Sequence, residues 1–266
     1  MKGLVFLLFT SLILGRISEA RFACHTPPYN PKASSLLRGG QGDGIALWDG
    51  GLVPYEVSGS FTHSDRETFM KAIRSIEEMT CIRFVPRTGE PAYMEAGRSC
   101  DCEGECVHPG CIPGQCFGGG WTEGLGKDSP NRLFIGQTCL SPDRREDVAF
   151  MMHELFHILG VIHTQTRPDA RSNIKILWKN IQDSKNARYQ YKRCSLCKTY
   201  DTAYSCMSIM YYREYFGPDP NKPTMVAKKS NPGCDLRTSP IELAETDIQL
   251  LNKMYKCEAK PTPGKI

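Results

Sequence analysis

The chain of 266 residues has few long apolar runs. The one sustained apolar stretch, from Gly3 to Leu14, is too short to cross a bilayer, and no other segment is longer and as apolar. We therefore expect no membrane-spanning helix. The sequence also has no Asn-x-Ser/Thr motif, internal repeat, linker or low-complexity block, which predicts one domain without an N-linked glycan.

Over most of the chain, neither positive nor negative charge is in excess. The formal net charge is +4, but the first 38 residues hold five basic residues and one acidic residue, which leaves 28 of each sign from Gly39 onward. A balanced charge provides no long-range attraction for phosphate backbones or anionic membranes. We therefore expect neither a nucleic acid nor a membrane as partner.

Histidine is scarce, with six in the chain, yet three fall within the segment HELFHILGVIH. On a helix, His153 and His157 lie one turn apart on the same face, so both imidazoles can reach one metal ion. Glu154 cannot point the same way and is left to hold a water molecule. Gly160 suits the left-handed conformation that ends helices, so the chain can turn and return His163 as a third ligand.

Three protein ligands with an open fourth position are typical of catalytic zinc, which lowers the pKa of a bound water to about 7. We therefore expect one Zn²⁺ per chain, with Glu154 as general base. Two other interpretations of the motif exist. The HExxH pattern alone also occurs in ordinary amphipathic helices, and a structural zinc site would add a fourth ligand that excludes water.

The motif and its flanks resemble the astacin family of zinc metalloendopeptidases, within the metzincin superfamily. The histidine segment matches the long metzincin signature, and Arg167 and Asp169 resemble positions of the astacin extension of it. The resemblance covers the chain from about Gly39 to Cys257. Three further segments resemble the family's methionine turn, the start of its mature enzyme and its second strand: SIMYY at 208–212, LWDGGLVPY at 47–55 and CIRFVP at 81–86.

The resemblance implies an α+β fold with two lobes. The N-terminal lobe is expected to hold a twisted, mostly parallel sheet and two helices, and the C-terminal lobe to be irregular with a final helix. Met210 is expected to lie beneath the histidines as an apolar floor. Tyr212 is expected to be an additional zinc ligand that leaves the metal during catalysis and donates a hydrogen bond to the developing oxyanion. The resemblance also implies the disulfides Cys81–Cys257 and Cys116–Cys139.

Three positions depart from the family pattern without removing a zinc ligand or the general base. Thr164 replaces a glutamate that helps to hold the buried mature N-terminus, which puts that anchoring in doubt. Ala170 and Arg171 replace an Arg-Asp pair, and Tyr211 replaces the histidine of the methionine turn.

Local patterns predict the elements around the motif. The strand expected at 132–136 would form the upper rim of the cleft in a metzincin, where an extended peptide could add to its edge. The predicted elements are a helix from a Ser64–Glu67 capping box to about Met79, strands at 81–85 and 132–136, the zinc helix from near Pro142 to Gly160, and a last helix from Ser239 to about Tyr255.

Residues 1–20 have the pattern of a secretory signal peptide, with Lys2, the apolar stretch and a Ser-Glu-Ala cleavage site. The secretory route is oxidising, so the 13 cysteines are best interpreted as disulfide partners. The cysteine-rich segment 100–111 favours disulfide packing, and a second zinc site is the alternative. Eight cysteines receive no assigned partner: Cys100, Cys102, Cys106, Cys111, Cys194, Cys197, Cys206 and Cys234.

Cleavage after Arg38 would place Trp48 at the distance from the new N-terminus that mature astacins have. We therefore expect a propeptide at 21–38, a peptidase domain at 39–257 and a tail at 258–266 that is too short for an accessory module. Cys24 is the one cysteine before the domain. As a thiolate it is a candidate latency ligand for the open zinc position, and an unpaired or intermolecular thiol is the alternative.

The sequence thus predicts a secreted, monomeric zinc endopeptidase that is made as a zymogen, cleaved by an activating protease and directed at protein or peptide substrates. The physiological substrate and the cleavage specificity are not predicted. The alternative from another class is a secreted binding protein that uses the cysteine-rich segment for recognition and keeps the metal fold as a scaffold. Retention of Glu154 beside all three histidines favours the enzyme.

Replacing Cys24 with serine tests the latency hypothesis. If the thiolate occupies the zinc position, the unprocessed Cys24→Ser protein should cleave a generic protein substrate that the unprocessed parent leaves intact. Equal inactivity of both unprocessed proteins would contradict a role for Cys24.

Overall fold

The computed structural model describes residues 47–98, 120–123, 131–135, 140–183, 185–212, 219 and 221–258. The helices are α1 (His63–Met79), α2 (Arg145–Ile158), α3 (Ala170–Asn173), α4 (Lys185–Tyr189) and α5 (Glu245–Met254). The strands are β1 (Leu52–Val57), β2 (Arg83–Pro86), β3 (Met94–Arg98), β4 (Gly120–Glu123), β5 (Asn131–Ile135), β6 (Ile174–Ile176) and β7 (Met225–Ala227).

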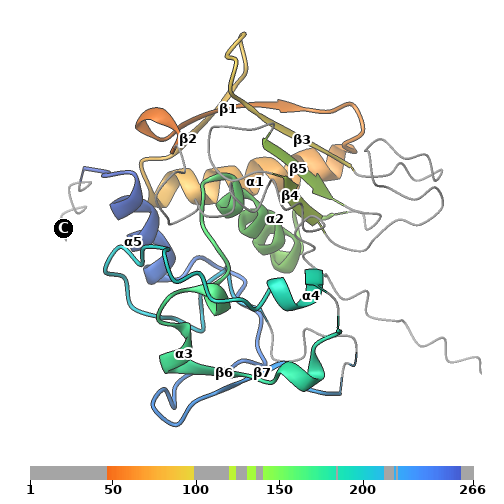
Figure 1. Cartoon of the computed structure of the whole chain (residues 1–266). Helices are drawn as coiled ribbons and strands as arrows, with labels where there is room; N and C mark the ends of the chain where they lie inside the picture. Colours follow the sequence, from red (N-terminus) through yellow and green to blue (C-terminus); the bar gives the residue numbers. More distant parts are fainter. Residues whose placement is uncertain are drawn as a thin grey trace, which may run out of the picture.

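The N-terminal lobe is built on a five-stranded sheet in the order β2-β1-β3-β5-β4, in which only β4 runs antiparallel to its neighbour. Helices α1 and α2 pack against each other beneath this sheet (Figure 1). The C-terminal lobe lies on the far side of α2 and holds the short β6–β7 pair with α3 and α4. The predicted α+β fold with a mostly parallel sheet and two helices in the first lobe is confirmed.

The two lobes have separate apolar cores that share no residue. The larger core joins the sheet, α1 and α2, and it also takes in Met210 and the inner face of α5. The smaller core lies around β6 and β7 and includes Tyr211 and Tyr212. Consecutive residues 210 and 211 therefore belong to different cores, and the methionine turn is one of the places where the chain passes between them.

Helix α1 begins two residues earlier than its predicted capping box. Thr62 is the cap: its hydroxyl accepts from the Asp65 amide at 3.2 Å, and the Asp65 carboxylate accepts from the Thr62 amide at 2.9 Å. Ser64, the predicted cap, instead donates to the Leu140 carbonyl at 2.6 Å. Asp65 also forms a buried two-pronged ion pair with Arg98 at the end of β3. One carboxylate therefore fixes the start of α1 and the end of β3 together.

The last helix was predicted to begin at Ser239, which is wrong because α5 begins at Glu245. Glu242, expected to complete the capping box, instead forms an ion pair with Arg145 of α2. Asp247 takes the capping role and accepts from the Ala244 amide at 3.1 Å.

The strand predicted as the free upper rim of the cleft is not an edge. Strand β5 pairs with β3 on one side and with β4 on the other, so the outer strand here is β4. An added peptide strand would therefore have to pair with β4, because both sides of β5 already carry backbone hydrogen bonds.

Three disulfides lie within the described residues. Cys81 is bonded to Cys257, which is the pair that the family resemblance implied. Two more pairs, which the sequence left unassigned, are Cys194–Cys197 and Cys206–Cys234. Cys24, the predicted pair Cys116–Cys139 and the cysteine-rich segment lie outside the described residues. Within the part of the chain that the structure describes, no helix combines the length and the apolarity needed to cross a membrane.

Candidate zinc site

Helix α2 ends in a compact turn that reverses the direction of the chain. Gly160 has φ of +89°, which an L side chain rarely adopts. The Gly160 amide donates to the His157 carbonyl at 2.8 Å, and the Val161 amide donates to the Phe156 carbonyl at 2.9 Å. These two bonds define a Schellman motif. The chain consequently reverses over a few residues and brings His163 back toward α2.

Two other residues bond to the last carbonyls of this helix region from distant parts of the chain. The Trp48 indole N–H donates to the Ile158 carbonyl at 2.9 Å. The Tyr255 hydroxyl donates to the Leu159 carbonyl at 3.0 Å. Together with the turn, every carbonyl from Phe156 to Leu159 has a donor, so the buried end of the helix leaves none of them unpaired.

The three histidines of the motif converge on one point. The Nε2 atom of His163 lies 3.1 Å from that of His153 and 3.0 Å from that of His157. All three side chains are buried, and among the described residues they form a group able to hold a metal ion. Tetrahedral zinc with bonds of 2.0–2.1 Å would hold ligand nitrogens about 3.3 Å apart, so the cluster fits zinc with small adjustments.

Backbone carbonyls orient two of the imidazole rings. Nδ1 of His153 lies 2.7 Å from the Ile209 carbonyl oxygen, and Nδ1 of His157 lies 2.8 Å from the Val161 carbonyl oxygen. A carbonyl oxygen only accepts, so each Nδ1 carries the proton and each Nε2 presents a lone pair. This is the tautomer that a metal ligand needs.

The pKa values of the three histidines favour the binding of a cation. Burial lowers the pKa of His153 to about 4 and, together with the neighbouring His153, lowers the pKa of His157 to about 3. The pKa of His163 lies well below its usual value for the same reason, with contributions from both other histidines. All three imidazoles are therefore neutral near pH 7 and bind a metal without first losing a proton.

The other predicted site residues surround this cluster. Glu154 is 1% exposed and follows His153 on α2. The Tyr212 ring lies 4.3 Å from the His163 ring, centroid to centroid, and its hydroxyl donates to Oε1 of Gln190 at 3.4 Å. Met210 is buried, and its carbonyl accepts from the Thr164 amide at 2.9 Å. The structure thus brings these residues to the histidines, while the roles assigned to them stay predictions.

Asp247 is a residue of this site that sequence reasoning missed. Its buried carboxylate accepts from the Ser208 hydroxyl at 2.6 Å and from the Ile209 amide at 2.8 Å. The Ile209 carbonyl in turn accepts from His153. Burial raises the pKa of Asp247, and the hydrogen bonds oppose that rise. The Ala-x-x-Asp pattern at 244–247 was the available signal, but the helix had been predicted to start earlier.

Two positions of the family extension form one contact. Arg167 bonds both oxygens of Asp169, at 2.9 and 2.8 Å, and it also donates to the Thr202 carbonyl at 2.7 Å. This network holds the chain that leaves His163 against the segment before the methionine turn. Thr164 is buried within it. The N-terminal anchoring that Thr164 puts in doubt lies outside the described residues.

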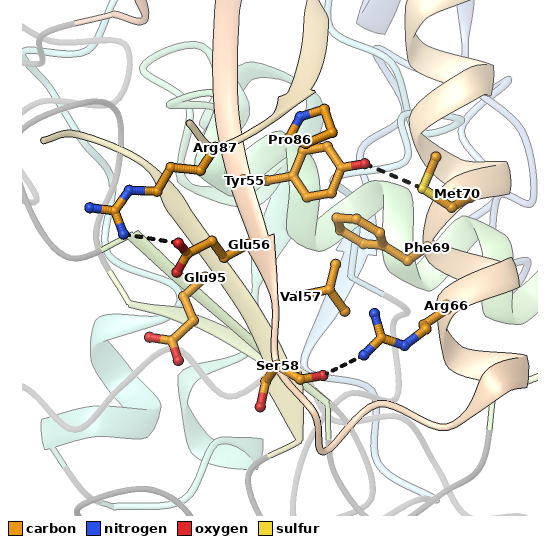
Figure 2. Close-up of a pocket in the computed structure, with 10 residues that line it drawn as sticks. All are labelled: Tyr55, Glu56, Val57, Ser58, Arg66, Phe69, Met70, Pro86, Arg87 and Glu95. Atoms are coloured by element: carbon orange, nitrogen blue, oxygen red, sulfur yellow. Dashed lines mark hydrogen bonds and ion pairs between the residues drawn. The ribbon is translucent and has the colours of Figure 1, made fainter. Parts of the chain in front are cut away.

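A hollow of about 510 Å³ lies beside β1, away from these residues. Figure 2 shows mostly apolar side chains where β1 faces α1, with Arg66 donating to the Ser58 carbonyl at 3.0 Å. Charged side chains lie on the other side of the strand, where Arg87 pairs with Glu56 at 3.0 Å. None of the three histidines lines it. It is therefore separate from the metal cluster.

The Asp247→Asn variant tests the support of the methionine turn. An amide has one acceptor oxygen, so it cannot accept from the Ser208 hydroxyl on one side and from the Ile209 and Ala244 amides on the other, and the free energy of unfolding should fall by about 2 kcal/mol. Because the turn orients His153, affinity for Zn²⁺ should fall roughly 10-fold or more in a chelator competition. Asp183→Asn, at an exposed position, is the matched control. Unchanged Zn²⁺ affinity in Asp247→Asn would contradict the proposed path to His153.

The sequence matches a family model described as Astacin, a peptidase family, over residues 41–256. Tolloid-like protein 2 of Homo sapiens is 29% identical over 216 residues, which cover 80% of this chain and 19% of that protein. Zinc metalloproteinase nas-7 of Caenorhabditis elegans is 30% identical over 224 residues, which cover 83% of this chain and 51% of that protein. The chain therefore spans only about a fifth to a half of the length of these relatives.

Solved structures of zinc proteases are also similar to this chain. High choriolytic enzyme 1, a hatching enzyme zinc-protease from Oryzias latipes, aligns with a TM-score of 0.62 and 25% identity over 80% of this chain and 94% of that one. Myroilysin aligns with a TM-score of 0.52 over 79% of this chain and 95% of that one, and at 16% identity it shows the fold alone. Since the family model spans both lobes and most of the sequence, the chain belongs to the astacin family.

Proposed function

We propose that the chain is a secreted, zinc-dependent endopeptidase that hydrolyses peptide bonds of protein substrates. The observation that carries the proposal is the convergence of three neutral imidazoles with a buried glutamate next to one of them. Astacins are zinc-dependent, and relatives of this chain include a zinc metalloproteinase and a hatching enzyme zinc-protease. One Zn²⁺ per chain would be held by His153, His157 and His163.

When bound, zinc supplies Lewis acidity, which polarises the scissile carbonyl and acidifies a water molecule. Glu154 accepts the proton that the attacking water loses as the new C–O bond forms. The same carboxyl then donates that proton to the amine nitrogen as the C–N bond breaks.

Tyr212 is proposed as an additional zinc ligand and as the donor to the oxygen that gains negative charge. Its phenol already has an alternative partner, since it donates to Gln190 in the structure. A hydroxyl with two partners can turn from one to the other, which a ligand that must leave the metal requires. Donors in such a role contribute about 3 kcal/mol to the stability of the transition state.

Secretion, zymogen activation near Arg38 and a monomeric state belong to the same proposal. The signal-peptide pattern at 1–20 and the three disulfides support an oxidising destination. The activating protease would remove residues 21–38, and Cys24 is the proposed latency ligand in the uncleaved form.

The Glu154→Ala variant is the central test. In protein trimmed to begin at Gly39, the variant should keep one Zn²⁺ per chain and lose turnover of a generic protein substrate by about 1,000-fold. Glu146→Ala, at an exposed position of the same helix, should match the parent. A chelator should abolish parental activity. Near-parental turnover by Glu154→Ala would contradict the mechanism, and bound zinc without any cleavage by the parent would favour a binding protein.

The Tyr212→Phe variant tests the oxyanion donor. We expect kcat to fall roughly 100-fold with little change in KM, because the lost bond forms only in the transition state. Tyr211→Phe is the matched control, since it removes the same hydroxyl from the neighbouring buried tyrosine of the same core, which has no proposed role at the metal. An unchanged kcat in Tyr212→Phe would remove the tyrosine from the mechanism.

A further inference from the structure

The disulfide between Cys194 and Cys197 differs from the other two described disulfides. Its cysteines have a sequence separation of 3, whereas those of the other two disulfides have separations of 28 and 176. A disulfide stabilises a fold mainly by restricting the unfolded chain, and that restriction grows with the length of the closed loop. Of the three described disulfides, this one therefore stabilises the fold least through the unfolded chain. We look for its role in the native state.

The loop that it closes is accessible to a reagent. Cys194 is half-buried, Cys197 is 7% exposed, and Leu196 between them is 68% exposed. Cys206 and Cys234 are both buried, whereas Cys81 and Cys257 are half-buried. Access therefore separates the Cys194–Cys197 disulfide from the first of these pairs, and its short loop separates it from the second. An incoming thiolate would reach Cys194 first, because access decides which sulfur is attacked.

The sequence around this loop is basic. Lys192, Arg193 and Lys198 flank the two cysteines and are all exposed, and no acidic residue lies between 190 and 199. Positive charge near a cysteine favours its thiolate and attracts an anionic thiol. A Cys-x-x-Cys pair in such surroundings is typical of a disulfide that exchanges.

The loop is also bonded to the chain that follows the third histidine. The Cys194 amide donates to the Thr166 carbonyl at 2.8 Å, and Thr166 donates through its amide and its hydroxyl to the His163 carbonyl, at 3.0 and 2.8 Å. Within the loop, the Cys197 amide donates to the Cys194 carbonyl at a long 3.4 Å. Opening the disulfide removes the covalent closure of this turn.

A residue that hydrogen-bonds Tyr212 belongs to the same segment. Gln190 accepts from the Tyr212 hydroxyl through its side chain, and from Nε2 of Gln165 through its carbonyl at 3.3 Å. A displacement of the backbone at Cys194 can therefore affect the positions of His163 and Tyr212, through Thr166 and Gln190 respectively.

We propose that the Cys194–Cys197 disulfide is a thiol-exchange site for low-molecular-weight thiols, and that its opening lowers the activity of the zinc site. A thiolate attacks the Cys194 sulfur, forms a mixed disulfide there and expels Cys197 as a thiolate. A second thiolate attacks the sulfur of the first, which releases an oxidised dimer of the thiol and leaves Cys194 reduced. The two protons of the attacking thiols end on the two cysteines, so the disulfide gains two electrons and the thiols lose two.

Exchange is tested on the full chain, without any measurement of peptidase activity. The protein is incubated with graded amounts of reduced glutathione, alkylated and mapped by peptide mass spectrometry. Cys194 and Cys197 should be alkylated at lower thiol concentrations than Cys206 and Cys234 or than Cys81 and Cys257, and the glutathione adduct should lie on Cys194. Reduction of all three disulfides together, or of this one last, would overturn the proposal.

The basic flank is tested with two charge-matched variants. Lys192→Glu with Arg193→Glu should slow exchange with glutathione about tenfold, because the flank then repels the thiol and disfavours the thiolate. Lys71→Glu with Arg74→Glu makes the same change of charge at exposed positions of α1. Equal slowing in both variants, or none in the first, would contradict a local role of the flank.

The effect on activity rests on the proposed function, whereas the exchange itself does not. A Cys194→Ser, Cys197→Ser double variant should turn over substrate roughly tenfold more slowly than the parent. Glutathione should slow the parent to that level and leave the double variant unchanged. Equal inhibition of both proteins would mean that the thiol binds zinc directly, and the coupling would be wrong even where the mapping supports exchange.

Discussion

The abrupt end of α2 is the constraint on which the site depends. The third histidine can reach the first two only because the chain reverses at Gly160, where φ is +89°. A helix end buried in this way would leave carbonyls without donors, at about 1–3 kcal/mol each. Trp48 and Tyr255, from opposite ends of the described chain, donate to two of them. The end of α2 therefore depends both on Gly160 and on contacts from distant parts of the chain.

Hydrogen bonds from both lobes meet around the histidine cluster. Asp247 caps α5 and at the same time holds the methionine turn, whose Ile209 carbonyl orients His153. On the other side, the loop that starts near Gln190 contacts Tyr212 and the chain after His163. His153 and Tyr212 are thus positioned by contacts from distant parts of the sequence, whereas His157 is oriented by Val161, four residues further along the chain.

Local sequence predicted the site better than it predicted the boundaries of the elements around it. The spacing of His153, Glu154 and His157 needs only a helix, and Gly160 needs only its own backbone freedom, so both follow from neighbours in sequence. The capping boxes failed because Ser64 and Glu242 resemble caps but have distant partners, Leu140 and Arg145. The resemblance implied that β5 forms the rim, whereas its pairing with β4 depends on residues that the sequence does not show to be neighbours.

By itself, the sequence determined the chemistry of the site: three imidazoles, a glutamate and a turn at one short segment, since helical periodicity acts over a few residues. Only the tertiary structure decided that Asp247 supports the methionine turn, that Cys194 pairs with Cys197, and that Trp48 and Tyr255 close the helix. The physical reason is that a polar side chain has many possible hydrogen-bond partners, and the local sequence does not decide among them. Burial then selects the set that leaves the fewest polar groups unpaired, and that selection involves residues far apart in sequence.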